Sequence, residues 1–278
     1  MLLFVFYVMN FTEVCAMKRL GILIGFLCVS FFSWAQVRVE KLVIKPGESF
    51  ELDHQSDIIV ADTIIMMDSS KIVLNELKRE NFIRTKVAII GNNCSIIGVG
   101  FHGQSGRAGR PGNSLVGPCR DGSSGTNGTP GLSGGPGSNL FFYVDELKIN
   151  GQLIIDLSGG NGGDGGAGGQ GGDGSPGTVH CNGGNGANGG DGGRGGEGGN
   201  AGSLMISSVN ADIIRNWIGS KLIYKNYSGK AGQGGRGGYA GSAGLGPSRR
   251  NGKDGSPGSY GTNGTRGKDG TLTFEMNQ

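Results

Sequence analysis

The segment Gly159–Gly177 reads GGNGGDGGAGGQGGDGSPG, and every third residue from Gly159 onward is glycine. In a helix with three residues per turn, such as polyproline II, residues three apart fall on one ridge. A ridge without side chains lets a second backbone approach closely. The period therefore predicts packed extended helices. It occurs in six runs, numbered one to six in chain order: residues 100–112, 122–137, 159–177, 183–198, 229–244 and 252–270.

The six runs come in pairs that are joined by short connectors, residues 113–121, 178–182 and 245–251. Strand-like segments at 139–158 and 203–228 separate one pair from the next, and residues 36–99 consist of short apolar runs rich in β-branched residues. Such runs favour strands over helices. We expect a mainly β fold: a scaffold of strands, arranged as in a β-helix, that carries three glycine-rich hairpins, with no substantial α-helix in the mature chain.

Three structures are compatible with a glycine period of three. A collagen triple helix combines it with roughly 15–20% proline or more, whereas residues 100–270 hold 55 of the 60 glycines but only seven prolines. A flexible linker is typical of glycine-rich chains, but it does not explain the constant phase or the pairing of runs. A bundle of polyglycine II helices from one chain explains both, and we favour it.

The triplets also predict a layering of the bundle. Runs three, four and five carry small residues on two ridges, whereas runs one, two and six have one bare ridge. A helix with neighbours on two sides needs two bare ridges, so we expect runs three, four and five to be interior and the others peripheral.

The six-run pattern resembles the polyglycine II bundles of the snow flea antifreeze protein and the glycine-rich tips of some phage tail-fibre adhesins. The resemblance covers residues 100–270, rests on the glycine period, and assigns no functional residue. It implies a rigid bundle and two kinds of function, ice binding and adhesion. The same region is superficially collagen-like.

The amino terminus predicts export. Met17-Lys18-Arg19 precedes an apolar run and then Ser33-Trp34-Ala35, the pattern of a signal peptide cleaved after Ala35. Residues 1–16 are an upstream start that need not be translated, and together with the apolar run they could instead form an uncleaved anchor. We expect domains at 1–35 (signal peptide), 36–99 (β scaffold) and 100–278 (glycine hairpins interleaved with strands), and a protein that is secreted or held on a bacterial outer surface.

Three cysteines remain in the mature chain. Cys119 and Cys181 each lie in a connector, and two hairpins that point the same way would bring their tips together. Export favours oxidation, so we predict a Cys119–Cys181 disulfide and a buried free thiol at Cys94, with three free thiols as the alternative.

The sequence contains only weak matches to the motifs of metal-binding, nucleotide-binding and catalytic sites. Residues 159–164 match the start of the calcium-binding motif GGxGxD, but the large apolar residue needed after each Asp is missing, so a solvated polar ridge is expected. Matches to G-x-G-x-x-G follow from the glycine period and lack a flanking strand and helix. The three histidines have no partner at a recognisable spacing. We therefore expect no metal, no cofactor and no enzymatic activity.

Basic residues gather in and beside runs one and six. They are expected to be a solvated surface or a patch for acidic polysaccharide, and nucleic acid is an improbable partner at a net charge of +3 outside the cell. The predicted function is that of a secreted or cell-surface structural and adhesive protein, a monomer that binds surface glycan or another cell-surface polymer. Alternatives are an ice-binding protein and a collagen-like trimer. The basic residues are Arg107, Arg110, Arg249, Arg250, Lys253, Arg266 and Lys268.

Overall fold

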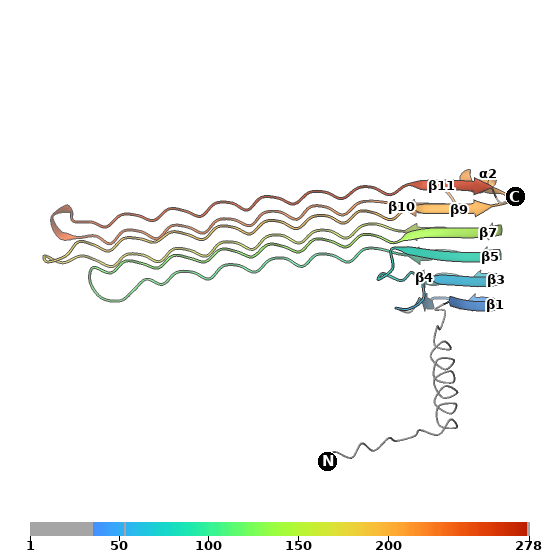
Figure 1. Cartoon of the computed structure of the whole chain (residues 1–278), viewed down its shortest axis with the longest axis horizontal. Helices are drawn as coiled ribbons and strands as arrows, with labels where there is room; N and C mark the ends of the chain where they lie inside the picture. Colours follow the sequence, from blue (N-terminus) through green and yellow to red (C-terminus); the bar gives the residue numbers. More distant parts are fainter. Residues whose placement is uncertain (1–35, 53, 277–278) are drawn as a thin grey trace, which may run out of the picture. The chain divides into compact units, whose positions relative to one another are not determined.

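The computed structural model describes residues 36–52 and 54–276, so the predicted signal peptide lies outside the described residues. The described chain is mainly β, as predicted, and consists of two parallel sheets (Figure 1). Its one α-helix is α2 (Ala211–Arg215), and no described helix is long and apolar enough to cross a membrane. Sheet A contains, in spatial order, β1 (Gln36–Ile44), β3 (Ile58–Met66), β5 (Glu80–Ile90), β7 (Asn139–Ile149), β9 (Leu204–Ser208) and β11 (Leu272–Met276). Sheet B contains β10 (Leu222–Lys225), β8 (Leu153–Asp156), β6 (Cys94–Ile97), β4 (Lys71–Val73) and β2 (Ser49–Glu51).

The chain alternates between the two sheets, so that each coil of a solenoid contributes one strand to each sheet. Inward side chains stack in ladders because the neighbouring strands are parallel and in register. One ladder runs from Ile59 through Ile83 and Phe142 to Ile206, all buried. Burying such side chains contributes about 1.5–3 kcal/mol each, which is the main stabilisation of this base.

The three glycine hairpins leave the solenoid at one corner. They replace the connections from β6 to β7, from β8 to β9 and from β10 to β11, whereas the equivalent connections after β2 and β4 are short. We call the six runs together the glycine array. In Figure 1 they lie side by side as long traces that extend away from the sheets.

The two sheets continue into the array as two layers. Runs one, three and five follow the strands of sheet B, and runs two, four and six precede the strands of sheet A. The register is preserved: Leu140 pairs with Leu204, 64 residues later, and in the array the Asp121 side chain bonds the Asn185 N–H, also 64 residues later. The sheets therefore set the lateral alignment of the runs.

The layers contact each other directly because glycine leaves no side chain between them. Within a layer, Gly165 donates to the Gln233 carbonyl at 2.7 Å; between layers, Gly166 donates to the Thr129 carbonyl at 2.9 Å. These bonds recur every third residue along the runs. A Cβ atom on Gly165 would lie closer than 3.0 Å to the Gly193 carbonyl oxygen, so the close approach requires glycine.

The hydrogen bonds correct the predicted layering in part. Runs three and four each bond to four other runs, in agreement with an interior position, and runs one and six each bond to two. Run five bonds to runs three, four and six, and run two bonds to runs one, three and four, so these two are equivalent. No run is enclosed, since a two-layer array leaves one ridge of every run exposed, as at Asn161 and Asn185 in runs three and four.

Candidate functional site

The far ends of the three hairpins form the candidate site, which we call the tip and define as residues 113–121, 178–182 and 245–251. Each segment reverses the chain between two runs, and all three lie at the same end of the array (Figure 1). Short connectors at the ends of stiff, mutually bonded runs have little freedom, so their side chains are held in a fixed arrangement.

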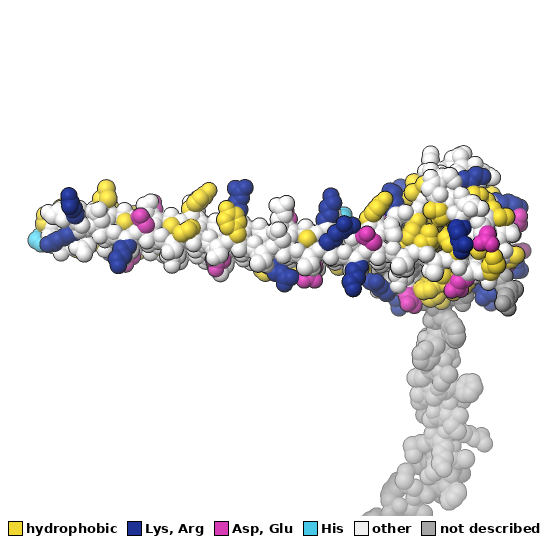
Figure 2. Space-filling model, turned by 90° about the horizontal axis from the view of Figure 1, so that it is seen from above, with side chains coloured by type: hydrophobic (Ala, Val, Ile, Leu, Met, Phe, Trp, Pro, Cys, Tyr) yellow, Lys and Arg dark blue, Asp and Glu magenta, His cyan; other side chains and the backbone are white. Residues whose placement is uncertain are grey.

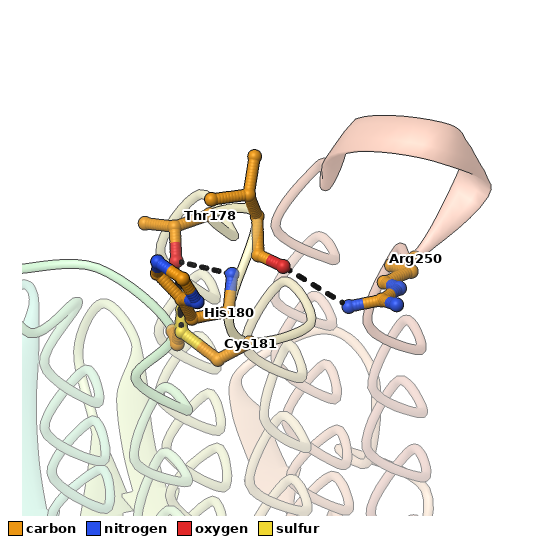
Figure 3. Close-up of a disulfide and its surroundings, with 6 residues drawn as sticks. Thr178, His180, Cys181 and Arg250 are labelled. Carbon is orange, nitrogen blue, oxygen red and sulfur yellow. Dashed lines mark hydrogen bonds between the residues drawn. A yellow bond between two sulfur atoms is a disulfide. The ribbon is translucent and has the colours of Figure 1, made fainter.

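A disulfide joins the first two connectors. It links Cys119 to Cys181, the pair expected from the sequence, with Cα atoms 6.0 Å apart. Thr178 lies beside it: its N–H donates to the Cys181 carbonyl at 2.9 Å, and its hydroxyl accepts a hydrogen bond from the His180 N–H at 3.3 Å (Figure 3). Cys94 is free and buried, and its thiol lies 3.1 Å from the Met67 carbonyl oxygen.

Further contacts fasten the connectors to one another. The Ser175 hydroxyl, at the end of run three, donates to the Leu115 carbonyl in the first connector at 2.5 Å. On the other side, Arg250 donates from Nη1 to the Val179 carbonyl at 3.3 Å (Figure 3). The tip is thus one connected surface rather than three independent loops.

The tip exposes several aliphatic side chains. Val116 is 96% exposed, Val179 71% and Leu245 72%. The tip also carries exposed arginines, among them Arg249 and Arg250 of the third connector. In Figure 2 the end of the array shows hydrophobic and basic side chains together with a histidine. Clustered exposed apolar groups typically mark interaction sites. These side chains were not among the functional residues expected from the sequence, although aliphatic residues in otherwise polar connectors are a readable signal.

The predicted basic patch does not form as one surface. Arg107 and Arg110 lie in run one and Arg266 and Lys268 in run six, and these two runs share no backbone hydrogen bond because they occupy opposite sides of the array. Arg266 is also paired with Asp269, at 3.2 Å. The seven residues are thus divided between the two sides of the array, with Arg249, Arg250 and Lys253 at the tip and the start of run six.

The polar residues of the calcium-like motif have another role in the structure. The side chain of Asp164 accepts the backbone N–H of Gln233 at 2.8 Å, and that of Asp173 accepts the N–H of Ser242 at 2.7 Å. Among the described residues no group of three or more possible metal ligands occurs. These side chains thus satisfy N–H groups on the exposed faces, where no neighbouring carbonyl is available.

Side chains also close the two edges of the array. In run two, the Thr126 and Thr129 hydroxyls accept the N–H groups of Arg110 and Arg107, each at 2.7 Å. At the opposite edge, side chains of run six bond outward-facing N–H groups of run five, as Asn263 does with Gly234 at 2.9 Å. Unpaired N–H groups at an edge can pair with a further chain. Because side chains already occupy these N–H groups, the array does not offer them to a seventh run.

Comparison of the chain with protein-family models, curated proteins and solved structures finds no match. The geometry of the tip, the array and the solenoid therefore carries the functional argument by itself.

Proposed function

We propose that this protein is an exported structural and adhesive protein, in which the solenoid is the base, the glycine array is a stiff rod and the tip binds a partner. The observation that carries the proposal is the tip itself: exposed Val116, Val179 and Leu245 held in place by the Cys119–Cys181 disulfide at the end of the array. Such fixed side chains lose little conformational entropy on binding.

We further interpret the runs as polyglycine II helices from one chain. The hydrogen bonds between runs recur every third residue, as expected of three residues per turn. At about 3.1 Å per residue, the 19 residues of run three would span roughly 55 Å. The tip would then be displayed well away from the base.

The chemistry of the tip favours an anionic surface polymer. Arginine forms strong, bidentate hydrogen bonds to carboxylate, sulfate and phosphate groups, and the aliphatic side chains suit the apolar faces of sugars. We therefore propose surface glycan, or another cell-surface polymer with acidic groups, as the partner.

The test is a glycan array probed with the mature chain, residues 36–278. The variants Val116→Asp and Leu245→Asp introduce repulsion at the tip, and Leu132→Asp is the matched control because Leu132 is also exposed, at 61%, but lies along run two. We expect loss of glycan binding in the two tip variants and retention in the control. Equal binding by all four proteins would exclude the tip.

Ice binding remains a second candidate, favoured by one face of run six. Ser256, Ser259, Thr262 and Thr265 are exposed at intervals of three residues, which spaces their side chains about 9 Å apart. An ion pair between Arg194 and Glu197, at 2.9 Å, lies on run four, which is hydrogen-bonded to run six, so charged groups occur on the run next to this row. Measurable thermal hysteresis by the mature chain would favour ice binding over adhesion.

A further inference from the structure

The outer face of sheet A contains a hollow of about 940 Å³ that lies on the solenoid and not at the tip. It crosses the strands, since its lining residues come from β1, β3, β5 and β7 and from Val209 beyond β9. A hollow that crosses parallel strands runs along the axis of the solenoid, and its shape suits a chain molecule laid across successive coils.

One row of the hollow is set by strand register. Arg38, Val60, Arg84 and Tyr143 are direct partners in four neighbouring strands, and all four line the hollow. Neighbouring strands are about 4.8 Å apart, so the Cα atoms of Arg38 and Arg84 are separated by about 10 Å, with Val60 between them. Tyr143 extends the same row by one strand.

The hollow coincides with a gap in the strand pairing. Ala61 and Thr63 pair with Thr85 and Val87, but no pairing joins the residues between them. The same interruption recurs at Asp145 in β7. The interruptions lie at equivalent positions of neighbouring strands, and the lining residues Asp62, Lys86 and Asp145 stand at these positions.

Two of the cations in the hollow are uncompensated. Lys86 forms an ion pair with Asp62 at 2.9 Å. Arg38 and Arg84 are exposed, and neither guanidinium group makes a hydrogen bond or an ion pair with any residue in the described part of the chain. Two free guanidinium groups in one row, beside a half-buried tyrosine ring, combine charge recognition with a surface for stacking.

We propose that this hollow binds a linear acidic polysaccharide, with Arg38 and Arg84 contacting successive carboxylate or sulfate groups and Tyr143 stacking on a sugar ring. The spacing of the two arginines fits a polymer that carries a charge at regular intervals along its length, and the open form of the hollow admits a chain whose ends continue beyond it. The site is separate from the tip, so that the protein would contact polymer at its base as well.

The experiment measures binding of the mature chain to polygalacturonate and to heparin by calorimetry, with neutral dextran and a single-stranded oligothymidylate as comparison polymers. We expect Arg38→Ala and Arg84→Ala each to weaken binding about tenfold, and Tyr143→Leu to weaken it more than Tyr143→Phe, which keeps the ring. Lys41→Ala is the matched control, because Lys41 is an exposed cation on β1 that does not line the hollow.

The outcomes separate this proposal from the tip. Absence of binding to both acidic polysaccharides, or binding that Arg38→Ala and Arg84→Ala leave unchanged, would overturn it. Equal binding to dextran would exclude charge recognition, and tighter binding to oligothymidylate would assign the hollow to nucleic acid instead. Because the tip is also proposed to bind acidic polymers, the same substitutions are compared in the Val116→Asp background, where the tip is weakened, and the losses caused by Arg38→Ala and Arg84→Ala should persist there. Gel filtration and circular dichroism of each variant would verify that the fold is retained.

Discussion

The Asp191 side chain accepts a hydrogen bond from the backbone N–H of Ser259, 2.7 Å away and 68 residues later in the chain. The relationship repeats along the same face, where Asn188 accepts the N–H of Ser256 and Asn185 that of Lys253, each at 2.8 Å. Asn and Asp on the exposed ridges thus act as fixed acceptors for the next run of the layer.

This role predicts a selective effect of substitution. Asp191→Ala should lower the free energy of unfolding by about 1 kcal/mol, because the Ser259 N–H loses its acceptor but remains accessible to water. Asp191→Asn keeps an acceptor oxygen and should be close to wild type, as should Ser259→Ala, whose hydroxyl makes no hydrogen bond in the described structure. Chemical denaturation measures all three. Equal losses would contradict the role of the side-chain oxygen.

Glycines that face another run should not tolerate a side chain. A Cβ on Gly165 or Gly192 would lie closer than 3.0 Å to a backbone carbonyl oxygen, of Gly193 and Gly235 respectively. Gly165→Val and Gly192→Val should therefore cost at least about 3 kcal/mol, whereas Ser256→Val, on an exposed ridge, should be mild. Thermal and denaturant unfolding would compare them, and similar stability of the three variants would refute close backbone packing.

The disulfide should form under oxidising conditions and stabilise the tip. Peptide mapping without reduction should recover Cys119 joined to Cys181, while Cys94 should react with an alkylating reagent only after unfolding, because it is buried. For a sequence separation of 62, chain-entropy arguments give a stabilisation of about 4 kcal/mol. A mapped bridge that contains Cys94 would contradict this arrangement.

Low pH should weaken the contact between Ser228, which directly precedes run five, and Asp269, near the end of run six. The Asp269 carboxylate accepts hydrogen bonds from the Ser228 hydroxyl and N–H, at 2.6 and 2.9 Å, and these bonds together with Arg266 lower the pKa of Asp269 below its usual value of 3.8. A lowered pKa contributes stability that is present above pH 3.8 and is lost as the pH falls through the folded-state pKa. Asp269→Asn should therefore reduce the dependence of stability on pH below 4. An unchanged acid profile would exclude this contribution.

The array should be complete within one chain. Every run bonds to at least two other runs, and Thr126, Thr129 and Asn263 occupy N–H groups at the two edges of the array. Light scattering on the mature chain should give the mass of one subunit. A stable trimer with a collagen-type melting transition would instead support the collagen interpretation.

Much of the local structure could be predicted from the sequence because it depends on patterns of residue type over a few consecutive positions. The β-branched runs predict the strands, the glycine period predicts close-packed extended runs, and the positions of Cys119 and Cys181 in connectors predict which thiols can meet. The equivalence of runs two and five could not be predicted, because counting bare ridges ignores the hydroxyls of Thr126 and Thr129, which bond to run one across a ridge that is not bare.

The glycine at every third residue, the pairing of the runs and the strands that separate the pairs are all visible in the sequence. Which runs are neighbours within a layer depends on tertiary contacts, because these contacts join residues about 60–70 positions apart and their register is inherited from the two sheets of the solenoid. For the same reason the structure separated Arg107 from Arg266 across the array, and brought Arg38 and Arg84 into one row. The glycine period determines which residues of one run share a ridge. The hydrogen bonds between distant segments determine which other run, or solvent, each ridge contacts.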